Sequence, residues 1–228
     1  MEHLALIMDG NRRWASRQGH SLFLGPESGT RAFEVAIECC LQRKIPFLSV
    51  YALSVENLQR SDESLQGLYG LLNRKGEELA QRLSERNVEM RFVGDRSLFD
   101  ASVVKIIEHI EQKTAGNTAL KVTSLFCYGG QQEIVAAAKK LAQKVARGEI
   151  LPEEIDTKSF GNELFTVGTP PPELIVRTGG AMRLSNFLLY QAAYSELVFL
   201  DILWPDLTSE VLSKVLDDFK GVVRNFGV

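Results

Sequence analysis

Short apolar runs alternate with longer amphipathic stretches along this chain. A short apolar run bounded by turn-forming residues is typical of a strand buried on both faces. Strands that alternate with helices form crossover units, in which the strands lie parallel. The pattern therefore predicts an α/β fold with a mostly parallel central sheet and helices on both faces. The predicted strands lie in LALIM, FLSVYAL, EMRFVG, LKVTSLFCY, ELIVR and ELVFLDIL.

Three stretches have the three- and four-residue apolar spacing of a helix: 27–43, about 62–86, and 130–147. The longest, 62–86, carries glycines in its interior. Each of them costs roughly 1 kcal/mol relative to alanine, so we expect this helix to be bent or locally mobile. Its leucine stripe is typical of ordinary core packing. The three glycines are Gly67, Gly70 and Gly76.

Composition favours one domain over residues 1–228, because a chain of this length with 45% apolar residues can bury one good core. A net charge of −3 argues against a general nucleic-acid surface. The three cysteines match neither a disulfide framework nor metal-ligand spacing, which indicates a reducing, cytoplasmic location. No run approaches transmembrane length, and no signal-peptide pattern precedes the first strand.

The segment LALIMDGNRRWAS, residues 4–16, concentrates the strongest chemical signal. A buried strand ends at Asp9, Gly10 allows close backbone approach, and Arg12 and Arg13 supply fork-shaped phosphate donors. A helix that opens here would add unpaired N–H groups, so the segment predicts a phosphate cradle. Asp9 beside bound phosphates is most simply a Mg²⁺ ligand. The alternative is a strand, a tight turn and a solvated helix start.

A second polar segment, SVENLQR at residues 54–60, also follows a predicted strand. Asn57 can donate and accept hydrogen bonds, and Arg60 can neutralise a diphosphate. Alone, the segment is equally a turn with a capping serine.

The third segment, RTGGAMRLS at residues 177–185, predicts a diphosphate site. It places Arg177 at a strand end, with a Gly-Gly turn behind it and Arg183 and Ser185 at the start of a following helix. Ligands of parallel sheets bind beyond the carboxyl ends of the strands, where four residues from separate segments would meet: Asp9, Ser54, Tyr128 and Arg177.

These segments, with the continuation SNFLLYQAAYSEL, resemble the cis-prenyltransferases, the undecaprenyl diphosphate synthase family. The resemblance runs from LALIMDGN to the terminal RNFG. It implies a Mg²⁺-dependent enzyme, a homodimer in the cytoplasm, that extends an allylic diphosphate primer with isopentenyl diphosphate. The product, an undecaprenyl-type polyprenyl diphosphate for the cell-wall lipid carrier, would partition to the membrane, and the helix at 62–86 would wall a hydrophobic tunnel for the growing chain.

The resemblance also implies roles for individual residues. It gives Asn57 a part in proton removal, although an amide is a poor base and we regard it as a positioning group. It assigns Arg60 to the allylic diphosphate, and Arg177, Arg183 and Ser185 to isopentenyl diphosphate. Glu196 would be a second Mg²⁺ ligand beside Asp9, in some family descriptions across the dimer interface. The remaining substrate-binding positions are Gly10, Asn11, Arg12, Arg13, Trp14, Ser54 and Glu56.

Several positions depart from the family pattern, mainly around the allylic site. Leu22 stands where an arginine is usual and Pro26 where a histidine is usual, while Arg12 replaces a glycine and could supply the contact that Leu22 cannot. These changes keep two alternatives open: an enzyme that makes a short or irregular product, and a non-catalytic subunit. No G-x-G-x-x-G or P-loop supports a nucleotide-binding protein. The other departures are Leu58, Cys127, Gln131, Ala181 and Asn225.

Overall fold

A computed structural model describes residues 1–21, 24–59 and 63–222. Its centre is a six-stranded sheet in the order β3-β4-β2-β1-β5-β6, in which every neighbouring pair is parallel. All six apolar runs that we predicted as strands form this sheet. The strands are β1 (His3–Ile7), β2 (Phe47–Ser54), β3 (Val88–Val93), β4 (Leu120–Tyr128), β5 (Leu174–Arg177) and β6 (Glu196–Phe199).

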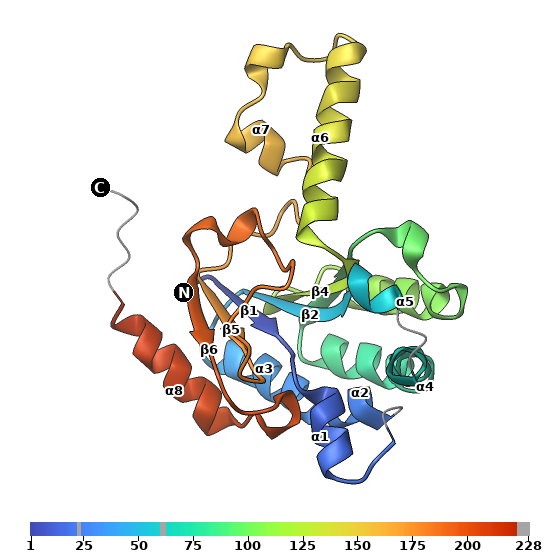
Figure 1. Cartoon of the computed structure of the whole chain (residues 1–228), viewed down its shortest axis with the longest axis vertical. Coiled ribbons are helices and arrows are strands. Elements are labelled where there is room, and N and C mark those ends of the chain that lie inside the picture. The colour runs from blue at the N-terminus through green and yellow to red at the C-terminus, as the bar shows by residue number, and fades with distance from the viewer. Residues whose placement is uncertain (22–23, 60–62, 223–228) are drawn as a thin grey trace.

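Helices and short 3₁₀ turns connect the strands (Figure 1). The helices are α1 (Asn11–Arg17), α2 (Gly25–Ser28), α3 (Thr30–Gln42), α4 (Glu63–Glu85), α5 (Ala101–Thr114), α6 (Gly130–Ala146), α7 (Thr157–Gly161) and α8 (Ser209–Lys220). The 3₁₀ turns are η2 (Val55–Gln59), η3 (Arg96–Leu98), η4 (Pro152–Glu154), η5 (Gln191–Tyr194) and η6 (Trp204–Asp206). In the part of the chain that the structure describes, none of these helices is long and apolar enough to cross a membrane.

The central strand β1 is buried on both faces, as its unbroken apolar sequence predicts. Leu4 and Leu6 belong to the larger core cluster, to which α3, α4, α5 and α8 contribute. Ala5 and Ile7 point the other way, into a smaller cluster that the loop residues Phe187 and Leu188 cover. The fold class is as predicted. The two faces of the sheet carry core clusters of unequal size, because the long helices α3, α4, α5 and α8 contribute to the larger one, the first core.

Helix α4 packs closely on α5, and Gly76 is the contact that requires a glycine. A Cβ atom at Gly76 would lie 2.2 Å from Cγ1 of Ile106. Gly76 is therefore required for the packing of α4 against α5. The bend or local mobility of α4 stays a prediction.

Helices α6 and α7 project together away from the sheet (Figure 1). The base of α6 is anchored by Glu133, which is fully buried and accepts hydrogen bonds from Tyr128, Gln191 and Thr166. A buried carboxylate needs such partners, since an unpaired one would cost several kcal/mol. This cluster fixes where α6 leaves the sheet.

Candidate active site

The carboxyl edge of the sheet brings together two of the predicted polar segments at a carboxylate-arginine pair. Nη2 of Arg177 donates to Oδ2 of Asp9 at 2.9 Å. The register explains the meeting, because Ile7 of β1 lies opposite Arg177 of β5 and Asp9 comes two residues later. Asp9 and Arg177, two of the four residues predicted to meet at the strand ends, are therefore in contact.

Arg177 is the hub of the site. Only 4% of its surface is exposed. Its Nη1 donates to Oγ of Ser185 at 2.8 Å and to the carbonyl of Arg183 at 2.5 Å. Its Nε is buried and has no hydrogen-bond partner among the described residues. A buried guanidinium with a spare donor suits an additional anionic ligand, because an unmet buried donor costs about 1–3 kcal/mol.

Arg13 holds the other side of Asp9. Its Nη2 donates to Oδ1 of Asp9 at 3.1 Å and its Nη1 donates to the carbonyl of Gly179 at 2.9 Å. Gly179 has φ +87°, and a Cβ there would lie 2.4 Å from Nη2 of Arg13. Glycine at position 179 therefore leaves the space in which Arg13 reaches Asp9. Both carboxylate oxygens consequently face arginines.

Gly10 and the start of α1 differ in part from our expectations. Gly10 has φ +120°, and a Cβ there would lie 2.9 Å from Cα of Leu203. The close neighbour is therefore protein, where we had expected a ligand. The predicted helix does begin directly after it, at Asn11. Asn11 lines the cavity described below, and its Oδ1 is buried without a hydrogen-bond partner among the described residues.

Trp14, which the resemblance placed among the substrate-binding residues, lies outside the cavity lining. Its indole N–H donates to Oδ1 of Asp206 at 2.8 Å, and its ring stacks on His20 with centroids 6.0 Å apart. Trp14 therefore joins α1 to η6. Its position in this structure does not support the expected contact with substrate.

The end of β2 and the 3₁₀ turn η2 bring Ser54, Glu56 and Asn57 to the same edge. The backbone N–H of Asn57 donates to Oγ of Ser54 at 3.3 Å, which is the capping turn we considered. Glu56 accepts from Nδ2 of Asn186 at 2.7 Å. Arg60, predicted here, lies outside the described residues, as does Leu22.

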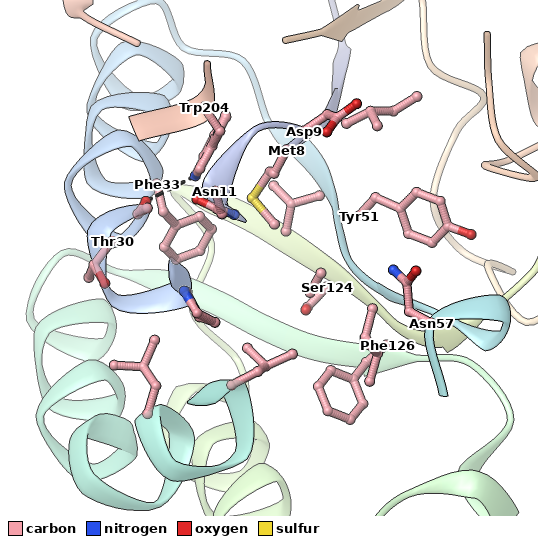
Figure 2. A pocket seen from close by; sticks show the side chains of 18 of the residues that line it. Met8, Asp9, Asn11, Thr30, Phe33, Tyr51, Asn57, Ser124, Phe126 and Trp204 are labelled. Atoms are coloured by element: carbon pink, nitrogen blue, oxygen red, sulfur yellow. Dashed lines mark hydrogen bonds between the residues drawn. The ribbon is translucent and has the colours of Figure 1, made fainter. Parts of the chain in front are cut away.

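A cavity of about 1480 Å³ opens from this edge into the first core. Pockets for drug-sized molecules typically measure about 300–1,000 Å³, so the cavity suits a larger ligand. Figure 2 shows Asp9 and Asn57 at its polar side, with Phe33 and Phe126 facing the interior. Its apolar wall comes from β2, β3, β4, α3 and α4 and includes Phe33, Val50, Leu68, Leu72, Leu79, Met90, Phe92 and Phe126.

The cavity combines a charged end and an apolar interior in one space. Asp9, Arg13, Arg177, Arg183 and Ser185 line it at the carboxyl edge of the sheet. The leucines of α4 line it further in, so the stripe that resembled ordinary core also faces the cavity. This arrangement fits an amphiphile with an anionic head and a long apolar tail.

Glu196 does not join Asp9. It is the first residue of β6 and lies opposite Leu174, which in turn lies opposite Leu4 of β1. Glu196 is therefore at the amino edge of the sheet, roughly 10 Å of strand below the register of Ile7 at about 3.3 Å per residue. Within one chain the register separates Glu196 from Asp9, and the role of Glu196 as a second metal ligand stays a prediction.

A turn replaces the helix that we expected to start at Arg183 and Ser185. Ser185 and Asn186 both have positive φ, 52° and 66°, and residues 181–190 form turns and bends. Two successive residues in the left-handed region cannot continue a right-handed helix. The turn brings Oγ of Ser185 to Arg177 instead.

Of the described departures from the family pattern, Arg12 and Pro26 line the cavity, and Leu58, Cys127, Gln131 and Ala181 are not among its lining residues. Pro26 is at the start of α2 and lines the cavity, whereas Leu58 packs against the first core. Burial raises the pKa of the Cys127 thiol to about 12, so this residue is an inert apolar group. Gln131 is exposed at the start of α6, and Ala181 is partly exposed in the turn after Gly180.

Three residues that shape the site were not predicted from the sequence. Thr178 donates through Oγ1 to the carbonyl of Asp9 at 2.7 Å and so fixes the end of β1. Tyr51 lines the cavity and donates to the carbonyl of Tyr128 at 3.1 Å; burial, aided by the charge of Glu56, raises the pKa of Tyr51. Asn186 bridges separate segments. Two of the three lay in motifs quoted from the sequence, Thr178 in RTGGAMRLS and Asn186 in SNFLLYQAAYSEL.

A family model described as "Putative undecaprenyl diphosphate synthase" matches residues 7–227 of the chain. The chain belongs to this family. It is 38% identical over 226 residues to a ditrans,polycis-undecaprenyl-diphosphate synthase ((2E,6E)-farnesyl-diphosphate specific) of Xylella fastidiosa, covering 99% of this chain and 89% of the relative. It is 39% identical over 225 residues to an isoprenyl transferase of Caulobacter vibrioides, covering 99% and 87%.

Two solved structures share the fold of this chain. Lavandulyl diphosphate synthase from Lavandula x intermedia, in complex with dimethylallyl diphosphate, matches with a TM-score of 0.94 at 30% identity, over 100% of this chain and 98% of that one. A probable undecaprenyl diphosphate synthase from Campylobacter jejuni matches with a TM-score of 0.83 at 31% identity, over 100% and 99%. The predicted family, the cis-prenyltransferase fold and the isoprenyl transferase activity are confirmed.

Proposed function

We propose that this isoprenyl transferase condenses isopentenyl diphosphate with an allylic diphosphate and releases a polyprenyl diphosphate. The observation that carries the proposal is the position of the Asp9–Arg177–Ser185 cluster at the polar end of a cavity with an apolar wall. Diphosphates need several cationic and hydrogen-bonding donors, and isoprenoid tails need an apolar space. The site supplies both in one cavity.

The allylic diphosphate becomes the leaving group in this proposal. Negative charge grows on its bridging oxygen as the carbon–oxygen bond breaks, so fixed cations nearby lower the barrier. Arg13 is placed for this role by Asp9 and Gly179. Arg60 shares the role by its match to the family motif. Asn57, which lines the cavity, positions the reacting ends.

The extender diphosphate binds Arg177, Arg183 and Ser185. All three residues line the cavity, and Arg177 already holds Ser185 through Nη1. The double bond of isopentenyl diphosphate then attacks the allylic carbon, diphosphate leaves, and a proton is lost to a diphosphate oxygen. The remaining predicted substrate contacts, Gly10, Asn11, Arg12, Ser54 and Glu56, complete the polar end.

A Mg²⁺ ion is part of this proposal, held by Asp9 together with substrate phosphates. Asp9 suits this role as a single protein ligand, because Mg²⁺ commonly takes only one or two carboxylates and completes its coordination shell with phosphate and water oxygens. Asp9 is partly exposed, with 30% of its side chain accessible. No group of three or more His, Cys, Asp or Glu residues that could hold a metal occurs in the described parts of the chain. When bound, the ion would neutralise charge on the leaving diphosphate.

We further propose a homodimer in the cytoplasm. β6 is an edge strand, and Leu197 on it and Tyr194 before it are 43% and 65% exposed. Unpaired strand edges with apolar residues favour association. In such a dimer Glu196 could serve as a metal ligand only for the partner's site. Light scattering of the purified protein tests the assembly.

The long-chain product is the first candidate, because relatives of 38–39% identity carry that name. An undecaprenyl-type product would partition to the membrane and serve as the cell-wall lipid carrier. A short or irregular product is the second candidate. The similarity to the lavandulyl diphosphate synthase structure and the altered residue Pro26 at the cavity favour it.

The deciding experiment supplies radiolabelled isopentenyl diphosphate with dimethylallyl, geranyl or farnesyl diphosphate, with Mg²⁺ or with EDTA, and measures the chain length of the product. Extension of farnesyl diphosphate to a long chain supports the first candidate. A short product from dimethylallyl diphosphate supports the second. If no radiolabel from isopentenyl diphosphate enters a product with any primer, the proposed function is refuted. The non-catalytic subunit would then be the remaining alternative.

A further inference from the structure

We infer that Asn186 is a positioning residue that sets the separation between the two diphosphate sites of the proposed reaction. It follows Ser185, a proposed extender contact, and it binds Glu56, which precedes Asn57 in the proposed primer site. The inference rests on the proposed function only for which substrate binds at each of the two sites. The hydrogen bonds of Asn186 are seen in the structure whichever substrates bind.

The side chain of Asn186 meets two other segments of the chain. Its Nδ2 donates to Oε1 of Glu56 at 2.7 Å and to Oε1 of Gln132 at 3.0 Å. Its Oδ1 accepts from the backbone N–H of Gln131 at 2.8 Å. Three hydrogen bonds on one amide use most of its capacity. The loop after β2, the start of α6 and the turn after β5 are therefore joined at one side chain.

The backbone of Asn186 adds a fourth bond. Its carbonyl accepts from the N–H of Gly130 at 2.7 Å. Space here is tight, since a Cβ at Gly129 would lie 2.6 Å from Nδ2 of Asn186. The residue also has φ 66°, which asparagine tolerates better than most residues. The position thus requires an amide that can adopt a left-handed conformation.

The bond to Glu56 is the link between the two sites. On one side, Oγ of Ser185 accepts a hydrogen bond from Arg177 in the proposed extender site. Because Ser185 directly precedes Asn186 in the chain, a displacement of Asn186 also displaces Ser185. On the other side, Asn57 follows Glu56 in the same 3₁₀ turn. Misplacing two reactants by about 1 Å can cost about a hundredfold in rate. A change at Asn186 should therefore act on kcat more than on either KM.

Reversing the polarity of this bond tests the inference. Asn186→Asp keeps the acceptor for Gln131 and the tolerated φ, but it places a carboxylate against Glu56. Glu56→Gln alone keeps an acceptor for Asn186. In the double variant Glu56→Gln/Asn186→Asp the new glutamine donates to the new aspartate, while Gln132 can rotate its amide to donate as well.

We expect Asn186→Asp to lower kcat about tenfold or more, since hydrogen bonds to charged groups are worth about this factor, with both KM values within about threefold of the wild type. With Glu56→Gln as its reference, the double variant should recover most of the loss that Asn186→Asp causes in the wild type. Asn186→Gly, which fits φ 66° without any side-chain bond, should resemble Asn186→Asp and covers the case in which the aspartate variant does not fold.

Asn87 provides a matched control, because it has φ 57° and makes two side-chain hydrogen bonds with Thr118 away from the cavity. Asn87→Asp and Asn87→Gly should keep the wild-type kcat. The inference is overturned if Asn186→Asp and Asn186→Gly keep the wild-type kcat, or if the double variant is no better than Asn186→Asp. Condensation by the wild type, measured first, separates these outcomes from failure of the proposed function.

Discussion

Asp9 and Arg177 are separated by 168 residues in the sequence, yet Nη2 of Arg177 lies 2.9 Å from Oδ2 of Asp9. The pair joins the end of β1 to the end of β5 and holds a guanidinium that is almost fully buried. Asp9 therefore supports the structure as well as the proposed chemistry. Substitution of Asp9 can separate these two roles.

Replacing Asp9 by asparagine should abolish turnover and lower stability. The amide keeps the shape but leaves Arg177 and Arg13 without a counter-charge. Breaking a fully buried ion pair costs about 3–5 kcal/mol, and we expect less here because Asp9 is partly exposed. Single-turnover product formation and urea unfolding measure the two effects. Asp218→Asn, on the surface of α8, is the control; normal turnover of Asp9→Asn would exclude its proposed role.

Replacing Arg183 by alanine should raise the KM for isopentenyl diphosphate more than the KM for the primer. A charge-assisted hydrogen bond contributes about 1.5–3 kcal/mol, or roughly ten- to over a hundredfold in affinity. Steady-state kinetics with each substrate varied in turn tests this. Arg147→Ala, which removes an exposed pair with Glu149, should change neither value. Equal effects of Arg183→Ala on both substrates would contradict the division into two sites.

Replacing Gly76 by alanine should destabilise the protein although alanine is the better helix former. The new methyl would meet Ile106 of α5 at 2.2 Å, and overpacking typically costs about 1–3 kcal/mol against a helix-propensity gain of about 1 kcal/mol. Urea denaturation gives the free energies of unfolding. The loss should shrink when the alanine is introduced into an Ile106→Ala background; an unchanged loss would place the strain elsewhere.

His3 should make the protein less stable in acid. It is buried between Oγ of Ser49 and the carbonyl of Pro170, and burial lowers its pKa to about 4. Because the unfolded chain binds a proton near pH 6.5 and the folded chain does not, stability is full above pH 6.5 and falls as the pH drops toward 4. The loss amounts to about 3 kcal/mol at 1.36 kcal/mol per pH unit.

A His3→Gln variant is the measurement for this effect. Glutamine can donate and accept a hydrogen bond but does not titrate. Urea unfolding at several pH values between about 4.5 and 7.5 should show a shallower pH dependence for the variant than for the wild type. Parallel curves for His3→Gln and the wild type would rule out His3 as the cause.

Introducing arginine at Leu22 should improve farnesyl diphosphate as a primer if the departures changed primer use. The family pattern places an arginine there for the allylic diphosphate, and a bidentate arginine strengthens phosphate binding. Titration of the primer against the wild type and the variant measures the affinity. Leu151→Arg, on an exposed leucine, controls for added charge. Equal primer affinity in both would mean that this departure has no consequence for primer binding.

The sequence by itself determined the strands, the fold class and the central pair of the site. Apolar runs bounded by polar turns mark buried strands, and parallel strands end at one edge, so the pattern alone predicted that Asp9 and Arg177 lie together. The family motifs added the type of reaction. These features depend on local pattern and on the few ways in which parallel strands can connect.

Only the tertiary structure decided the contacts that depend on register and on side-chain direction. The register of β6 places Glu196 at the amino edge, away from Asp9. The left-handed backbone at Ser185 turns its hydroxyl toward Arg177 where a helix had been expected. Asn186 and Gly76 owe their roles to residues far away in the chain. Such partners are selected by packing of the whole core, and no local pattern in the sequence encodes them.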